Sequence, residues 1–149
     1  MRMSKDARFL YLYFLTCPEI NLCGIFKLCT EDMAHRTGME IEIVEKIIEE
    51  LSTLKIVYVY NDWVYIVNAV RHNNYFKSPT IYSAYLDEVI NIELSTIKFF
   101  MKKGFTLTLP QFDTTINSSM NTRQKTKTKN IKLKINNINK VLGIKNINN

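Results

Sequence analysis

The chain has 149 residues, a formal net charge of +6 and 46% hydrophobic residues, which is typical of one globular domain with a further segment. No apolar run approaches the roughly 18 residues that span a bilayer. Lys5, Asp6 and Arg8 interrupt the first residues, which excludes a signal peptide, so we expect a cytoplasmic protein.

A first helix is predicted after Ser4, whose hydroxyl can cap the helix N-terminus. Apolar residues on neighbouring helical rows indicate that it is mostly buried, and Pro18 ends it. After a loop, residues 24–28 form a short run of extended, apolar character.

Two helices joined by a short turn are predicted next. Thr30, followed by two acidic residues, indicates the start of the first, and Gly38 indicates its end. The second runs from about Glu40 to Leu54, because apolar residues recur there at steps of three and four. Two helices joined through a glycine-containing turn are typical of a helix-turn-helix.

Two β-rich runs, 56–60 and 63–67, are separated only by Asn61 and Asp62, which predicts a tight hairpin. Residues 24–28 are expected to pair with it as a third strand, because a lone hairpin is marginal in water. The order of elements predicts a winged helix-turn-helix domain over residues 1–70, in a mainly α (α+β) fold.

A helical extension is predicted over residues 71–104. It comprises a helical turn near 68–74, a longer helix from Pro79, and a further helix from about Ile92 to Lys103 that ends at Gly104.

Residues 105–149 are predicted to be a Thr/Ser-rich linker and a basic, Lys/Asn-rich tail. From Asn121 onward the chain has eight basic residues and no acidic one, so the first 120 residues carry a net charge of −2. Such asymmetry favours a polyanionic partner, most often nucleic acid.

The tail cannot form a core alone and is expected to be disordered when free, with transient helix over 131–149. An AT-rich codon bias is the alternative explanation of its composition.

Several basic residues are candidate nucleic-acid contacts, because ammonium and guanidinium groups neutralise phosphate. In the tail they are Arg123, Lys125, Lys127, Lys129, Lys132 and Lys134. On the body they are Arg71, His72 and Lys77, next to asparagines and a tyrosine, although ordinary surface charge is an equal interpretation of these three.

The third helix has an acidic outer face, which is the wrong sign for the DNA major groove. Its candidate protein-interaction residues, facing a basic partner or a second copy, are Glu42, Glu45, Glu49 and Glu50. A merely solvated face is the alternative. The hairpin aromatics Tyr58, Tyr60, Trp63 and Tyr65 could stack on unpaired bases, but covering the core or a dimer contact is the favoured interpretation.

Catalytic and metal chemistry find little support. The chain has only 4 glycines and 2 histidines, with no glycine-rich phosphate loop and no candidate triad, so we expect no enzyme, no cofactor and no metal. Cys17, Cys23 and Cys29 lack a zinc spacing and an export signal, so buried, reduced thiols are expected.

Residues 4 to about 90 resemble the N-terminal domain of phage replisome-organiser proteins, a DnaD-like winged-helix family. The resemblance rests on the stretches 7–16, 21–28, 37–38, 44–51, 63–68 and 71–73. It implies a non-catalytic module for origin recognition or self-assembly in a bacterial host cell, while the part that contacts the host helicase or its loader is nearly absent.

Three functions follow as hypotheses. The first is a phage DNA-replication initiation factor whose basic tail holds DNA. The second is a phage accessory protein that binds, or inhibits, a host protein through the acidic third helix. The third, which the glutamates of that helix disfavour, is a winged-helix transcriptional regulator.

Overall fold

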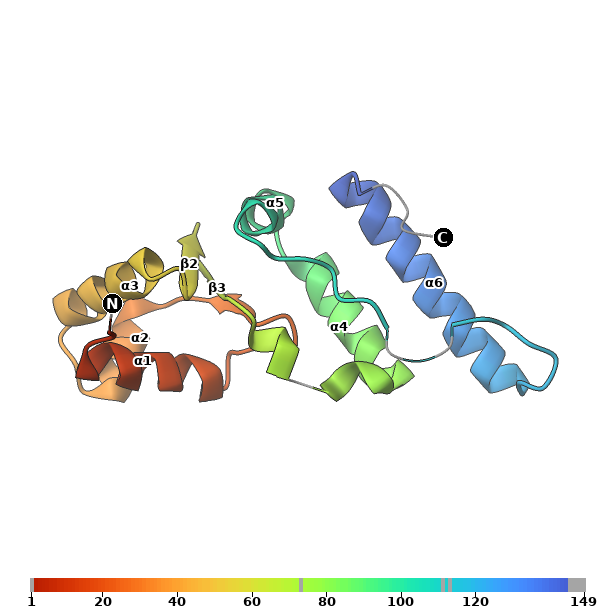
Figure 1. Ribbon diagram of the computed structural model, residues 1–149, viewed down its shortest axis with the longest axis horizontal. Coiled ribbons are helices and arrows are strands. Elements are labelled where there is room, and N and C mark those ends of the chain that lie inside the picture. The colour runs from red at the N-terminus through yellow and green to blue at the C-terminus, as the bar shows by residue number, and fades with distance from the viewer. Residues whose placement is uncertain (1, 73, 111, 113, 145–149) are drawn as a thin grey trace.

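The structure is a computed structural model that describes residues 2–144 except 73, 111 and 113, and for 71, 72, 74 and 75 describes the backbone alone. The described part is mainly helical, with six α-helices and a small three-stranded antiparallel sheet. Figure 1 shows helices α1 to α3 at one end of the long axis and α6 at the other, with the sheet, α4 and α5 between them.

The N-terminal part packs three helices, α1 (Lys5–Thr16), α2 (Thr30–Thr37) and α3 (Ile41–Thr53). Ser4 caps α1 as predicted, since its Oγ accepts a hydrogen bond of 3.1 Å from the Ala7 amide. Gly38 ends α2 in the left-handed region at φ 69°, which confirms the predicted turn. The core contains buried side chains from all three helices and the sheet.

The sheet joins β1 (Ile25–Lys27), β2 (Val57–Tyr60) and β3 (Trp63–Ile66) in the order β1-β3-β2. Asn61 and Asp62 both have positive φ, 47° and 60°, the combination that a tight type I′ hairpin requires. The predicted hairpin and its third strand are therefore both confirmed.

Both faces of this sheet are covered. Successive side chains of a strand point to opposite faces, and along β3 Val64 and Ile66 lie in the core of α1 to α3, whereas Tyr65 lies in a second core. That second core is formed with α4 (Pro79–Asn91) and α5 (Leu94–Lys102). The sheet thus separates two hydrophobic cores.

Two short 3₁₀ helices, Ala69–His72 and Asn74–Lys77, connect β3 to α4, where one helical turn was predicted. The segment predicted as a linker has no helix or strand among the described residues of 105–120, but its first part is held in place. The Thr108 carbonyl accepts a hydrogen bond of 2.9 Å from the Tyr82 hydroxyl. The Thr108 amide donates one of 3.0 Å to the Tyr85 hydroxyl. Phe105 is buried in the second core.

The predicted disorder of the tail is wrong for residues 122–142, which form the long helix α6 (Thr122–Leu142). Asn121 and Gln124 form a capping box at its start, and Gly143 ends it in the left-handed region. Its inner residues recur at steps of three and four and pack on α4 and α5; they are Thr128, Ile131, Ile135, Ile138 and Leu142. The alternating lysines suggest an extended chain, but an apolar row at helical spacing, together with α4 as its partner, decides the structure. The end of the predicted transient helix, 145–149, lies outside the described residues.

Candidate nucleic-acid interface

The outer side of α6 presents a row of lysines, which we call the lysine face. It comprises Lys125, Lys129, Lys132 and Lys140, with Asn136 between the last two. At 100° per residue, these five side chains fall within about a quarter of the helix circumference, centred about 130° from the packed isoleucines. The lysines extend along about 22 Å of the helix axis.

The lysine face has a strong local excess of positive charge. The segment from Asn121 to Leu142 contains no acidic residue. Among the described residues, none of the four ammonium groups contacts a carboxylate. Lys129, Lys132 and Lys140 are exposed, and Lys125 is half-buried. These groups can therefore neutralise anions from outside without first breaking an ion pair.

The other three predicted contacts of the tail lie elsewhere on α6. Lys134 turns toward α4, where its Nζ lies 2.7 Å from an Asp87 carboxylate oxygen and 2.8 Å from the Ser83 hydroxyl. Lys127, one heptad earlier, lies 3.5 Å from the Thr80 hydroxyl of α4. Arg123 is exposed, but its position places it about 100° or more from every member of the lysine face. Asp87 therefore already pairs with Lys134, and the nucleic-acid contact predicted for Lys134 stays a prediction.

The candidate contacts on the body lie apart from α6 in the chain. Arg71 and His72 end the first 3₁₀ helix, and their side chains lie outside the described part of the structure. Lys77 ends the second 3₁₀ helix and is exposed. Their role in nucleic-acid binding stays a prediction.

The outer face of α3 carries exposed carboxylates, as the sequence predicts. Glu42, Glu45 and Glu49 are exposed and share one side of the helix. Glu50 is different, because its two carboxylate oxygens accept hydrogen bonds of 2.7 and 2.8 Å from the Ser4 amide and hydroxyl. Glu50 therefore fixes the start of α1 to α3, and its predicted role in protein interaction stays a prediction.

The hairpin aromatics face α5. The rings of Tyr60 and Phe99 stack at 4.4 Å between centroids, with an angle of 13° between their planes. Tyr65 contacts Phe100 and Phe105, each at 5.5 Å. The favoured interpretation, that these aromatics cover a core, is confirmed for Tyr60 and Tyr65, since their rings are already packed within the protein.

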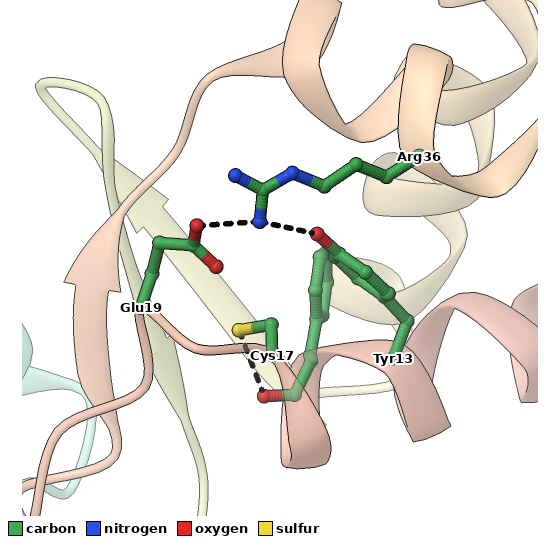
Figure 2. A network of polar contacts seen from close by, with 5 residues as sticks. Tyr13, Cys17, Glu19 and Arg36 are labelled. Atoms are coloured by element: carbon green, nitrogen blue, oxygen red, sulfur yellow. Dashed lines mark hydrogen bonds and ion pairs between the residues drawn. The ribbon is translucent and has the colours of Figure 1, made fainter.

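A polar cluster links α1, α2 and the loop before β1 (Figure 2). The Arg36 guanidinium donates to the Glu19 carboxylate at 2.6 Å and to the Tyr13 hydroxyl at 3.5 Å. The neighbouring Cys17 thiol donates to the Phe14 carbonyl, and burial raises the pKa of this thiol. A protonated thiol is a poor nucleophile. We therefore interpret the cluster as a structural contact that holds α1, α2 and the loop together.

The three cysteines divide into two buried and one exposed. Cys17 and Cys23 are buried free thiols, as predicted, and burial raises the pKa of Cys23 well above its ordinary value. Cys29 is exposed, so the prediction of burial is wrong there; it precedes α2 with its Sγ 3.5 Å from a Glu31 carboxylate oxygen.

Three of the six predicted tail cations, Lys125, Lys129 and Lys132, lie on the lysine face, and the sequence pattern alone did not show this sorting. The sequence interpretation treated 123–134 as one basic run and left out Lys140, which the helix brings onto the lysine face. The signal that could have found this arrangement is the spacing of Thr128, Ile131, Ile135, Ile138 and Leu142, which fixes which side of a helix faces inward.

Comparison of the chain with family models, with curated proteins and with solved structures finds no match in any of the three. Within the described ranges, none of the helices combines the length and the hydropathy needed to cross a bilayer.

Proposed function

We propose that this protein is a non-catalytic nucleic-acid-binding protein that contacts the phosphate backbone of double-stranded DNA through the lysine face of α6. The observation that carries the proposal is the row of four lysines, free of carboxylate partners among the described residues, on the outer side of a helix whose inner side is packed. Lysine is a point charge that neutralises phosphate and reads little sequence. The binding is therefore largely independent of sequence.

Duplex DNA fits this surface better than a single strand does. Single-strand binding uses aromatic side chains on which bases stack. The sequence of α6 contains no aromatic residue, and Tyr60 is already stacked on Phe99. Duplex RNA, which offers similar phosphates, is an outcome that the experiment below separates.

The order α1-β1-α2-α3-β2-β3 supports assigning the first 70 residues to the winged helix-turn-helix class. In that class α3 would be the recognition helix and the hairpin the wing. Here the outer face of α3 is acidic and one side of the hairpin lies against α5, which argues against a transcriptional regulator that reads the major groove. We place the protein among replication-initiation factors that resemble phage replisome organisers, acting in the cytoplasm of a bacterial host.

The test measures the affinity for a fluorescently labelled DNA duplex at several salt concentrations. Four phosphate contacts predict that log K falls against log salt with a slope of about −3.6. The variant Lys129→Gln/Lys132→Gln should bind more weakly and flatten that slope by about 2. Glutamine keeps a good helix propensity, so α6 should remain folded.

Lys98→Gln/Lys102→Gln is the matched control, because it removes the same charge from exposed positions of α5. Its slope should stay close to that of the wild type. An equal loss in both variants would show that only the net charge matters and would refute the lysine face. Parallel titrations with duplex RNA and with single-stranded DNA test the choice of duplex DNA; tighter binding of either would refute it.

A second candidate function is favoured by the exposure of Glu42, Glu45 and Glu49 on one side of α3. These carboxylates would bind a basic surface of a host protein. Glu45→Lys/Glu49→Lys should abolish such a complex in a pulldown from nuclease-treated host lysate, and a complex that survives would refute this function.

A further inference from the structure

Helix α1 presents a row of apolar side chains to solvent. Phe9, Leu12 and Leu15 are 51%, 59% and 38% exposed, and their spacing of three places them on the side opposite the buried Leu10 and Phe14. Lys5 and Arg8 are exposed beside them. A row of large exposed apolar side chains on one helix face is a feature of interaction surfaces.

A second apolar surface lies where α4, α5 and the end of α6 meet. It is a groove of about 290 Å³. Ile92, Ile97 and Ile138 in its wall are buried. At its rim, Ile90, Leu94 and Val141 are 52%, 42% and 58% exposed. The exposed Glu93 lies between two residues that line the groove.

The two surfaces are at different ends of the molecule. Figure 1 shows α1 in the half that lies away from α6, with the sheet in between. The α1 row therefore cannot reach the groove of its own chain. From this arrangement we infer that the α1 row of one copy docks into the groove of a second copy, so that one kind of contact covers both apolar surfaces.

Shape and charge agree with this pairing. A groove of about 290 Å³ is too small to hold a whole helix, which is about 10 Å wide with its side chains. Phe9 and Leu12 would therefore insert as single side chains while α1 lies across the rim. Lys5 and Arg8 would then face the side of the groove that holds Glu93, which has the opposite charge. The outer face of α3 is a poorer partner, because Ile41 and Ile43 lie on opposite flanks of its glutamates and form no continuous apolar row.

The contact is heterologous, since it joins two different surfaces, and it therefore builds open chains of copies or closed rings. The groove lies on the side of α6 away from the lysine face. A chain of copies would consequently keep every lysine face accessible. The inference goes beyond the proposed function and does not depend on it.

The test follows the mass of the nuclease-treated full chain by light scattering over a wide range of protein concentration. The wild type should grow beyond a dimer as its concentration rises. Phe9→Glu/Leu12→Glu loses the α1 row and Ile90→Glu/Val141→Glu loses the groove rim, so each should stay at the monomer mass of 17.5 kDa. All four positions are exposed, so both variants should remain folded, which circular dichroism would check.

An equimolar mixture of these two variants should form a species of two chains and grow no further, because each variant keeps one intact surface. Leu109→Glu/Ile116→Glu introduces the same change at exposed positions outside both surfaces and should assemble like the wild type. A wild type that is monomeric at every concentration, or a mixture that stays monomeric, would overturn the inference. DNA titration of the two monomeric variants tests the lysine face separately.

Discussion

Helices α3 and α6 are built on the same plan and present opposite charges. Each buries a row of aliphatic side chains, including Val44, Ile47 and Leu51 in α3 and Ile131 and Ile138 in α6. Outside, α3 presents glutamates and α6 presents lysines. Because the inner row packs each helix against the rest of the protein, the charge of the outer row is free to serve a partner. The two ends of the molecule therefore suit partners of opposite charge.

The two helices also differ in how firmly they are held. Helix α3 packs against α1, α2 and β2, whereas α6 packs against α4 and α5. Leu51 and Ile131 are both buried. Leu51→Ala should cost about 2–5 kcal/mol of stability and lower the midpoint of the whole unfolding transition. Ile131→Ala should act mainly by releasing α6, because fewer elements depend on that helix.

Hydrogen exchange distinguishes the two outcomes, since it reports the opening of each segment separately. Ile131→Ala should speed exchange in α6 while the amides of α1 to α3 keep their protection. A uniform loss of protection in both variants would show that α6 is as much a part of the cooperative unit as α3, and the comparison would fail.

Reversing the charge of α3 should make the two ends alike. Glu45→Lys/Glu49→Lys adds two free ammonium groups on an exposed helix face, and the salt slope of DNA binding should steepen by up to about 2. Glu45→Gln/Glu49→Gln removes the carboxylates without adding cations, and its slope should stay unchanged. Equal slopes in the Lys and Gln variants would indicate that DNA bound to α6 leaves α3 out of reach.

The ion pair between Lys134 and Asp87 is a smaller contribution to the attachment of α6. Asp87→Asn removes the charge but keeps a polar side chain beside the ammonium group. Since Asp87 is about half exposed, the expected loss of stability is about 0.2–1 kcal/mol, and it should shrink at high salt. Denaturant unfolding at low and high salt would measure it, and a loss that does not depend on salt would contradict an electrostatic origin.

The smallest expected effect on stability concerns Glu88 of α4, which contacts the loop before β1. Its carboxylate accepts a hydrogen bond of 2.7 Å from the Leu22 amide, and burial raises its pKa above the ordinary 4.5. The native state therefore binds this proton more readily than the unfolded chain does. The stability that Glu88 contributes is full below the ordinary pKa and declines as the pH rises through the raised one.

Glu88→Gln should remove this part of the pH dependence, because the glutamine oxygen can still accept the Leu22 hydrogen bond without ionising. Denaturation midpoints of both proteins, measured below and above the raised pKa, would show a difference that changes with pH. A constant difference would mean that the carboxyl titrates normally in the native state.

Strong local signals made the N-terminal part predictable. The aliphatic repeat of α3, the glycine after α2 and the Asn61-Asp62 turn each specify a backbone conformation within a few residues. Helix α6 has a capping box and a terminal glycine as well, but lysines and asparagines dilute its apolar row, and its stability depends on α4, which is far away in the sequence. The strand that pairs with the hairpin was predictable because a two-stranded sheet would be unstable.

The candidate site was predictable in composition and not in arrangement. The excess of positive charge after Asn121 is visible in the sequence. Which lysines face outward depends on the phase of the helix, and the neutralisation of Lys134 depends on Asp87, 47 residues earlier. The contact of Glu50 with Ser4 could not be predicted for the same reason, since the two residues are 46 positions apart.

The position of β3 between the two cores limits how the chain can be dissected. A fragment that stops at residue 70 would retain the sheet but lose α4, α5 and Phe105, which form the second core with Ile25 and Tyr65. Its bare aromatic surface would favour aggregation. Deletion experiments that aim to isolate the first 70 residues should therefore keep α4 and α5, and thermal melting of residues 1–109 should appear as one transition shared by both sides of the sheet.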